Sequence, residues 1–242
     1  MKKPFIIIPA IDILNGKAVR LFKGDYNQAT EYGSPIDMFK KWQQCGAKRI
    51  HIVDLDGARE GKMVNKDIIE ELAKIKGDTE IELGGGIRTY KSAQDYINGG
   101  IDYIILGSII VKDPNETEKI IKKYSDKIIF GLDCENGICK LSGWIEQTNV
   151  DVKEMLKDSY EKGVTKFIIT DIAKDGTLEG PAVQLYKSLP SKKDMEMYAS
   201  GGIGNTNDIK ELQKIKNVSG CIVGKALYDN KISETELWEL LK

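Results

Sequence analysis

The stretch IDILNGKA at residues 11–18 recurs as LDCENGIC at residues 132–139, and this repeat decides the fold. Three further motif pairs keep the same order, at offsets of 116 to 117 residues. Chance does not keep four motifs in order and spacing, so we infer two duplicated halves, about 1–125 and 126–242. The other pairs are VDLDG (53–57) with TDIA (170–173), GGI (85–87) with GGI (201–203), and LGS (106–108) with VGK (223–225).

Short apolar runs, rich in Ile and Val, recur along the whole chain and are typical of buried parallel strands. Eight such runs with helix-length polar stretches between them, in 242 residues, fit an α/β fold, the (β/α)₈ TIM barrel. A doubly wound sheet also holds eight units, but it reverses its strand order and would not repeat at half length. We therefore expect a single barrel domain over residues 1–242, built from two (βα)₄ half-barrels. The expected strands are 5–11, 50–53, 80–83, 103–106, 128–132, 167–170, 196–199 and 221–223, and helices are expected to start near Pro35, Asn65, Thr89, Asp113, Asp151, Pro181, Thr206 and Ser233.

Charge and composition exclude several classes of protein. The 36 basic side chains nearly balance the 37 acidic ones, whereas binders of nucleic acid or membrane surfaces usually carry a basic excess. No apolar run approaches the roughly 18 residues that a membrane span needs. Residues 1–4 are too short for the charged start of a signal peptide, so none is expected. The four cysteines form no Cys-x-x-Cys pair. We expect a cytoplasmic monomer with reduced thiols and with no nucleic-acid or membrane partner.

The chain has a single histidine, His51, which lies in a β-branched run and is expected to be a satisfied strand residue. One imidazole excludes a His-rich metal site and argues against a Ser–His–acid triad. We therefore expect no metal site, and we expect carboxylates to carry any proton transfer.

Glycine-rich motifs follow the strands expected at 80–83 and 103–106, and the duplication supplies a second set after 196–199 and 221–223. Glycine lets the backbone approach a ligand, and N–H groups that open the next helix bind anions. Their spacing is not Gly-x-Gly-x-x-Gly, so a dinucleotide site is not predicted. Two cradles across a barrel mouth predict a substrate with a phosphate at each end. The predicted binding residues are Gly85, Gly86, Arg88, Gly107 and Ser108 in the first half, and Gly201, Gly202, Gly224 and Lys225 in the second.

Asp12 and Asp133 are equivalent acids at the ends of the first and fifth expected strands. Four strands apart in an eight-stranded ring, they are expected to face each other across the mouth. Two carboxylates on opposite sides of a substrate suit a general acid and a general base if their environments separate the pKa values. Aspartates that follow strands are commonly structural caps, but both of these lie in matched Asp-x-x-x-Gly contexts.

Three other side chains follow the same strand ends. Arg20 is one of only four arginines against 32 lysines, and guanidinium is the better bidentate ligand for phosphate. Thr170 stands where the first half has Val53 or Asp54, and it is expected to orient a carboxylate or bind a substrate hydroxyl. Trp144 is expected either to cover a planar ring or to pack beneath its own loop. The polar segment 24–33 is expected to be a mobile loop.

Motifs spread over essentially the whole chain resemble those of one enzyme family, the phosphoribosylformimino-5-aminoimidazole carboxamide ribotide isomerases of histidine biosynthesis. The resemblance implies a barrel of two half-barrels, no metal or organic cofactor, and a substrate that carries two phosphates. The motifs are IPAID (8–12), GKAVRL (16–21), GDY (24–26), VDLDGA (53–58), GGGIR (84–88), GW (143–144) and KDGTL (174–178).

The resemblance further implies an Amadori rearrangement of an aminoaldose to an aminoketose. Proton donation to the ring oxygen opens the furanose, and a base then removes the C2 proton of the resulting Schiff base. Asp12 would accept the proton and Asp133 would donate it, with Thr170 assisting and Trp144 over the carboxamide-imidazole end. Asp175, in the KDGTL motif, would contact the substrate. Which aspartate moves which proton follows from the resemblance and not from spacing.

Three alternatives stay open at this point. The cyclase subunit of imidazole glycerol phosphate synthase shares the half-barrels and both aspartates, but it differs at 54–58, at 143–144 and at Thr170. A bifunctional relative that also isomerises phosphoribosyl anthranilate usually carries arginine where Ser142 stands. A barrel that binds phosphate without catalysis, as a sensor or partner subunit, is opposed by the intact pair of aspartates.

Overall fold

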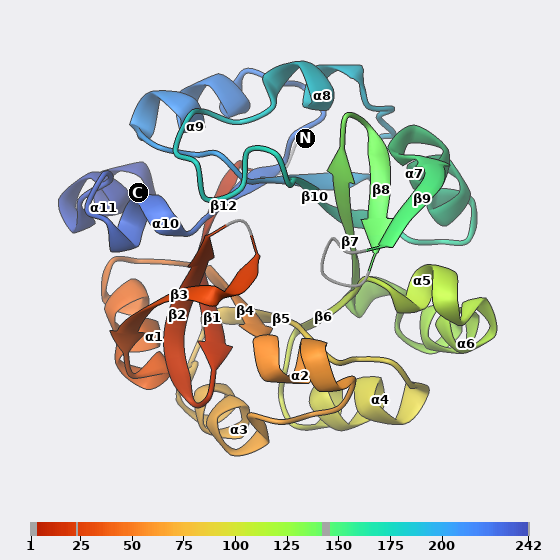
Figure 1. Cartoon of the computed structure of the whole chain (residues 1–242), viewed down its shortest axis with the longest axis horizontal. Helices are drawn as coiled ribbons and strands as arrows, with labels where there is room; N and C mark the ends of the chain where they lie inside the picture. The colour runs from red at the N-terminus through yellow and green to blue at the C-terminus, as the bar shows by residue number, and fades with distance from the viewer. Residues whose placement is uncertain (1–3, 23, 142–145, 242) are drawn as a thin grey trace.

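The fold is a closed ring of eight parallel strands (Figure 1). The structure, a computed structural model, describes residues 4–22, 24–141 and 146–241. Each strand pairs in parallel with both neighbours, and the pairing of β7 with β10 closes the ring, so the predicted (β/α)₈ barrel is confirmed. The barrel strands are β1 (Ile6–Leu14), β4 (Arg49–Asp54), β5 (Glu80–Gly84), β6 (Tyr103–Leu106), β7 (Ile128–Glu135), β10 (Lys166–Asp171), β11 (Glu196–Ser200) and β12 (Gly220–Val223).

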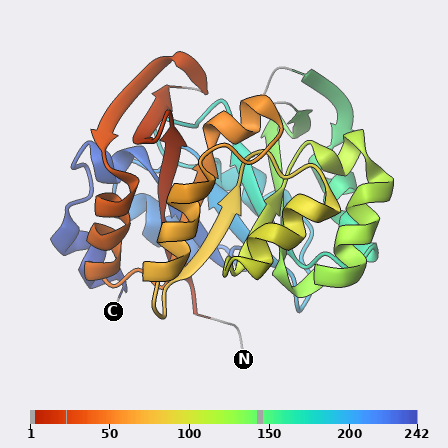
Figure 2. The ribbon, with the colours of Figure 1, turned by 90° about the horizontal axis from the view of Figure 1, so that it is seen from below.

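Helices surround the barrel, and their apolar faces pack on the outward residues of the strands (Figures 1 and 2). Side-chain caps set their starts: Thr89 closes a capping box, and Asp113 caps a helix that begins with Pro114. The predicted helix starts agree with the structure, except that α8 begins at Val183, just after Pro181. The helices are α1 (Pro35–Gln44), α2 (Leu55–Glu60), α3 (Lys66–Ile75), α4 (Tyr90–Asn98), α5 (Ile109–Lys112), α6 (Pro114–Tyr124), α7 (Val152–Glu161), α8 (Val183–Ser188), α9 (Thr206–Gln213), α10 (Lys225–Tyr228) and α11 (Glu234–Leu241), with a 3₁₀ turn η1 (Ser125–Lys127).

Two antiparallel ribbons extend from equivalent barrel strands, and both rise at the same end of the barrel (Figure 2). Each begins with an Asn-Gly turn at positive φ, 51° and 76° at Asn15 and Gly16, and 53° and 81° at Asn136 and Gly137. Such turns match the twist of a hairpin. The ribbons comprise β2 (Lys17–Phe22) with β3 (Asp25–Gly33), and β8 (Ile138–Leu141) with β9 (Glu146–Asp151).

The segment expected to be a loop at 24–33 forms the edge strand β3. Most of its side chains are exposed, so it lacks the apolar alternation by which a half-buried strand is recognised in sequence. The structure thus corrects its secondary structure, while its mobility stays a prediction.

The barrel interior has an apolar middle between two polar ends. At the N-terminal ends of the strands, Arg49 donates two hydrogen bonds to Glu80, at 2.8 and 2.7 Å. His51 lies 2.8 Å from the fully buried Glu82, so the histidine is a satisfied strand residue as predicted. The residues predicted to carry chemistry lie at the opposite end of the same strands. Between the two ends lie Ile8, Ala10, Ile129, Ile168, Tyr198 and Ile222.

Candidate active site

Asp12 and Asp133 lie near the C-terminal ends of β1 and β7, which are four positions apart in either direction around the ring. This places them on opposite sides of the barrel mouth, where active sites of this fold are built. Their strand partners are equivalent as well, since Asp12 pairs with Val53 and Asp133 with Thr170. The duplication therefore delivers one carboxylate from each half, and Thr170, which is buried, lies beside the second.

Arg20 holds the first carboxylate. Its Nη1 lies 2.7 Å from Asp12 Oδ2, and its Nη2 donates to the carbonyl of Ala10 at 3.1 Å. Both side chains of this ion pair are largely buried, with 13% and 16% of their surface exposed. Burial lowers the pKa of the guanidinium, but the charge and hydrogen bond of Asp12, together with Tyr228 and Asp175, outweigh it, and the pKa lies above its ordinary value. The structure thus places Arg20 against a predicted catalytic residue, while its contact with phosphate stays a prediction.

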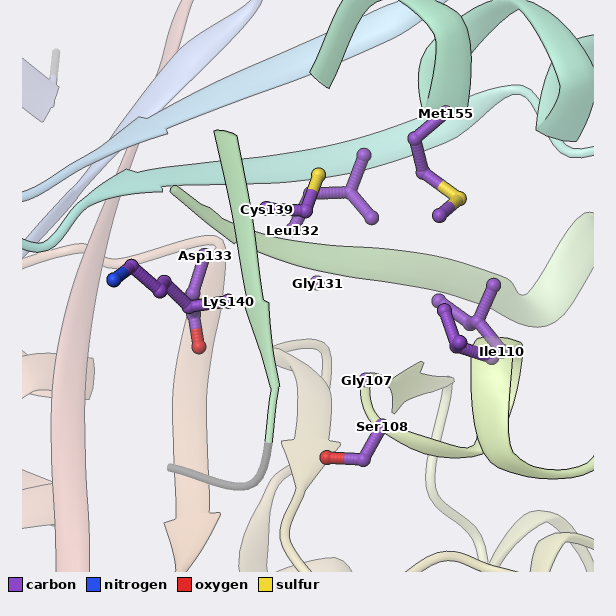
Figure 3. A pocket seen from close by; sticks show the side chains of 10 residues that line it. Gly107, Ser108, Ile110, Gly131, Leu132, Asp133, Cys139, Lys140 and Met155 are labelled. Carbon is purple, nitrogen blue, oxygen red and sulfur yellow. The ribbon is translucent and has the colours of Figure 1, made fainter. Parts of the chain in front are cut away.

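The second carboxylate lies on a hairpin with two different faces. Asp133 is paired with Lys140, and Figure 3 shows the two side chains next to each other on adjoining strands. Lys140 is largely buried and forms an ion pair of 3.1 Å with Glu135. The other face carries Cys134 and Cys139, both buried, whose thiol pKa values burial raises to about 12 and about 11. These thiols are core residues, and the charged face belongs to the mouth.

A cavity of about 70 Å³ lies beside Asp133, between β7, β8 and the helices α5 and α7 (Figure 3). Its polar end contains Ser108, Asp133 and Lys140, and the rest of its wall is mainly apolar. The cavity therefore joins the first predicted phosphate cradle to the second carboxylate. The lining residues are Gly107, Ser108, Ile110, Val111, Gly131, Leu132, Asp133, Cys139, Lys140 and Met155.

Asp175 is the mouth carboxyl with the clearest electrostatic perturbation. Burial raises its pKa to about 6, an effect that Arg20 opposes and that the charges of Asp12 and Asp133 reinforce. The loop that carries Asp175 is fixed to the start of α10, because Lys225 Nζ donates to the carbonyl of Gly176 at 3.1 Å. Asp175 therefore lies within electrostatic reach of both matched aspartates.

The glycine cradles share one backbone design. Gly85 and Gly86 adopt φ of 101° and 76°, and Gly201 and Gly202 adopt 97° and 83°. Only glycine takes these angles readily, and each first glycine also packs on a strand-end carbonyl, that of Asp54 or Asp171. A Cβ at either position would collide with that oxygen. The two halves therefore present the same close approach of backbone to the mouth.

The remaining predicted binding residues lie at the same rim. Arg88 donates to the carbonyl of Ala58 at 2.9 Å, which fixes the loops after β4 and β5 to each other. Gly107 and Ser108 precede α5, and Gly224 and Lys225 begin α10. Gly224 lies against the Arg20 guanidinium, which a side chain at that position would displace. Trp144 lies outside the described residues.

Sequence reasoning missed two mouth residues, Lys140 and Tyr228. Lys140 had a signal, because a two-residue Asn-Gly turn fixes the hairpin register and pairs position 140 with Asp133. Tyr228 had no local signal in the sequence. It reaches the mouth from α10, the helix that directly follows the last barrel strand, β12. Within the described ranges, no group of His, Cys, Asp and Glu side chains is arranged to hold a metal ion, and no helix is long and apolar enough to cross a membrane.

A closed (β/α)₈ barrel with one carboxylate and one glycine cradle from each half defines a class of barrel enzymes whose chemistry lies at the C-terminal ends of the strands. Within this class, the model of the histidine biosynthesis protein family matches residues 6–233. This chain belongs to that family.

Comparison with individual relatives supports the same family membership. A Bacillus subtilis protein is 42% identical over 241 residues, which cover 98% of each chain. Proteins of Streptococcus thermophilus and Caldanaerobacter subterraneus are 44% and 45% identical, covering 96% and 94% of this chain and 97% and 94% of their own. All three are named 1-(5-phosphoribosyl)-5-((5-phosphoribosylamino)methylideneamino) imidazole-4-carboxamide isomerase.

Proposed function

We propose that this chain catalyses the reaction for which these relatives are named, the isomerisation of a bisphosphorylated aminoaldose to the aminoketose in histidine biosynthesis. The observation that carries the proposal is the pair Asp12 and Asp133, one from each half, at facing positions of a mouth with two glycine cradles. Near-complete coverage by isomerases above 40% identity supports the same conclusion.

The proposed reaction needs four proton movements. A donor protonates the furanose ring oxygen, the C1–O bond breaks, and the nitrogen lone pair forms a protonated Schiff base. A base removes the C2 proton to give an enolamine, and protonation at C1 together with loss of the C2 hydroxyl proton then yields the aminoketose. We assign the base to Asp12, which Arg20 holds in place at 2.7 Å. Thr170, paired with Asp133 across β7 and β10, orients the second carboxylate.

The donor lies in the second half. The family resemblance assigns it to Asp133, and the structure adds Asp175, because burial raises the pKa of Asp175 to about 6 and keeps part of it protonated near neutral pH. We therefore propose that Asp133 and Asp175 together supply the donated protons.

The two cradles are proposed to bind the two phosphates, with Arg88, Gly107 and Ser108 on one side and Gly224 and Lys225 on the other. We propose further that the protein acts as a cytoplasmic monomer on a small-molecule substrate, without a nucleic-acid or membrane partner. The near-zero net charge agrees with this, since phosphate is bound by backbone amides and a few local cations.

An assay of the purified protein tests the proposal. The aminoaldose is expected to be converted, as followed by its near-ultraviolet absorbance, without added metal or cofactor. Absence of conversion, with ammonia-dependent cyclisation of the ketose instead, would indicate the sister cyclase. Turnover of phosphoribosyl anthranilate would indicate a bifunctional isomerase, and binding without any turnover would indicate a phosphate sensor.

A further inference from the structure

The last residue of α10, Tyr228, contacts the guanidinium that holds Asp12. The Tyr228 ring centre lies 5.0 Å from Arg20 Cζ, within the range of a cation–π interaction. Its hydroxyl donates to the carbonyl of Ala10 at 2.9 Å, and Arg20 Nη2 donates to the same carbonyl at 3.1 Å. The ring and this shared acceptor therefore restrain Arg20 in addition to its ion pair with Asp12.

Tyr228 is itself held firmly. Its ring centre lies 4.6 Å from that of Tyr32 on β3 and 5.9 Å from that of Trp42 on α1, the latter edge-on. Burial also raises the pKa of Tyr228 to about 12, so the hydroxyl remains a donor at physiological pH. Aromatic pairs in this geometry restrain one another beyond the effect of simple burial.

The position of Arg20 against Gly224 shows why the guanidinium needs this restraint. The guanidinium occupies the space where a side chain at position 224 would lie, so it rests between Asp12 and the second predicted phosphate cradle. A long, flexible side chain in that place has two anionic partners when substrate is present, the carboxylate and the phosphate. We propose that Tyr228 is a positioning residue that keeps Arg20 on Asp12, and thereby keeps the proposed base aligned during turnover. This inference rests on the proposed function.

Kinetics of three variants test the proposal. Tyr228→Leu removes the ring face and the hydroxyl, and it is expected to lower kcat about tenfold with KM within about twofold, because alignment and not binding is lost. Tyr228→Phe keeps the ring over Arg20 and is expected to restore kcat to within about threefold of wild type. In an Arg20→Ala background, Tyr228→Leu is expected to cause no further loss. An equal loss in both backgrounds, or a change in KM alone, would overturn the proposal.

Arginine side-chain spectra give a readout that needs no activity. The chain has four arginines, so the Nε–H region holds four signals, and Arg20→Lys identifies the one from Arg20. Tyr228→Leu is expected to remove the ring-current shift of that signal, and Tyr228→Phe to retain it. An Arg20 signal that is unchanged in Tyr228→Leu contradicts the proposal. An inactive wild-type protein would instead refute the proposed function. The spectrum would still test the contact between the Tyr228 ring and Arg20, because it needs no activity.

Tyr96→Leu is the matched control for folding. Tyr96 is another buried tyrosine, but it lies on α4, on the outside of the first half. Its variant is expected to lose a similar amount of thermal stability while kcat stays within twofold of wild type. If Tyr96→Leu lowered kcat as much as Tyr228→Leu, the effect would be one of stability and the positioning role would be refuted.

Discussion

The two half-barrels share their backbone design and differ in the side chains placed on it. Each carries an Asn-Gly hairpin turn, a pair of glycines with positive φ at the end of a strand, and an aspartate at the same strand position. The partners of that aspartate differ, however. On β1 they are Val19 and Val53, whereas on β7 they are Lys140 and Thr170.

This difference shows how a duplicated fold produces an asymmetric reaction. The two phosphates of the proposed substrate would require similar cradles, and the backbone repeats one conformation at both. An acid and a base require unlike environments, and only the side chains around the two aspartates differ enough to supply these. The first half holds its carboxylate with one arginine between valines, while the second places Lys140 and Thr170 beside its own. Asp175 lies within electrostatic reach of both aspartates.

The largest expected effect comes from removing either carboxylate. Asp12→Asn and Asp133→Asn keep the shape of the side chain but move no proton, so kcat is expected to fall about 10³-fold in each. Asp67→Asn, at an exposed position of α3, is the matched control and is expected to be fully active. Steady-state turnover of the aminoaldose measures all three. Wild-type rates in either active-site variant would mean that the halves do not share the chemistry.

The next largest effects are expected from substitutions of the cradle glycines, which lower stability. Gly85→Ala and Gly201→Ala combine an unfavourable φ with a collision against a carbonyl, and each is expected to lower the free energy of unfolding by about 2–4 kcal/mol. The contact is tighter at Gly85 than at Gly201, where the added Cβ would lie 2.8 Å from the oxygen, so Gly85→Ala is expected to cost more. Denaturant unfolding measures the difference. Gly77→Ala, at φ 53° with no atom near, isolates the φ effect, and equal losses at all three sites would refute the collision argument.

Exchanging the paired side chains tests the asymmetry itself. Thr170→Val removes a hydroxyl next to Asp133 and is expected to lower kcat about 10- to 100-fold, the worth of a hydrogen bond to a charged group. Val53→Thr makes the reverse change beside Asp12 and is expected to alter kcat by less than threefold. The same turnover assay compares both. Similar losses in the two variants would show that the halves are chemically equivalent.

The last expected effect concerns stability and pH. The pKa of Asp175 is raised from 3.8 to about 6 in the folded state, so the folded protein binds this proton more tightly than the unfolded chain. That contribution is present in acid and is lost as the pH rises through about 6. Asp175→Asn is therefore expected to be up to about 3 kcal/mol more stable than wild type at pH 8, and the difference is expected to fall to a small fraction of this at pH 4. Unfolding at both pH values measures it, and a difference independent of pH would contradict the raised pKa.

The sequence predicts most of the fold because the repeat reports topology directly. Four motifs in order identify equivalent strand ends, and these place Asp12 and Asp133 across the ring before any coordinates are known. The edge strand β3 escapes prediction because its exposed side chains carry no apolar period. Tyr228 escapes because its contacts with Arg20 and Ala10 join chain segments about 200 residues apart, which only the closed barrel brings together.

Calorimetric titration with the bisphosphorylated product and its two monophosphates tests the central claim most directly. If each half supplies one phosphate cradle, removing either phosphate is expected to weaken binding at least about 100-fold, or about 3 kcal/mol, and by similar factors. A monophosphate that binds as tightly as the bisphosphate would show that one cradle is idle. That result would contradict the account of a barrel whose two halves each hold one end of the substrate.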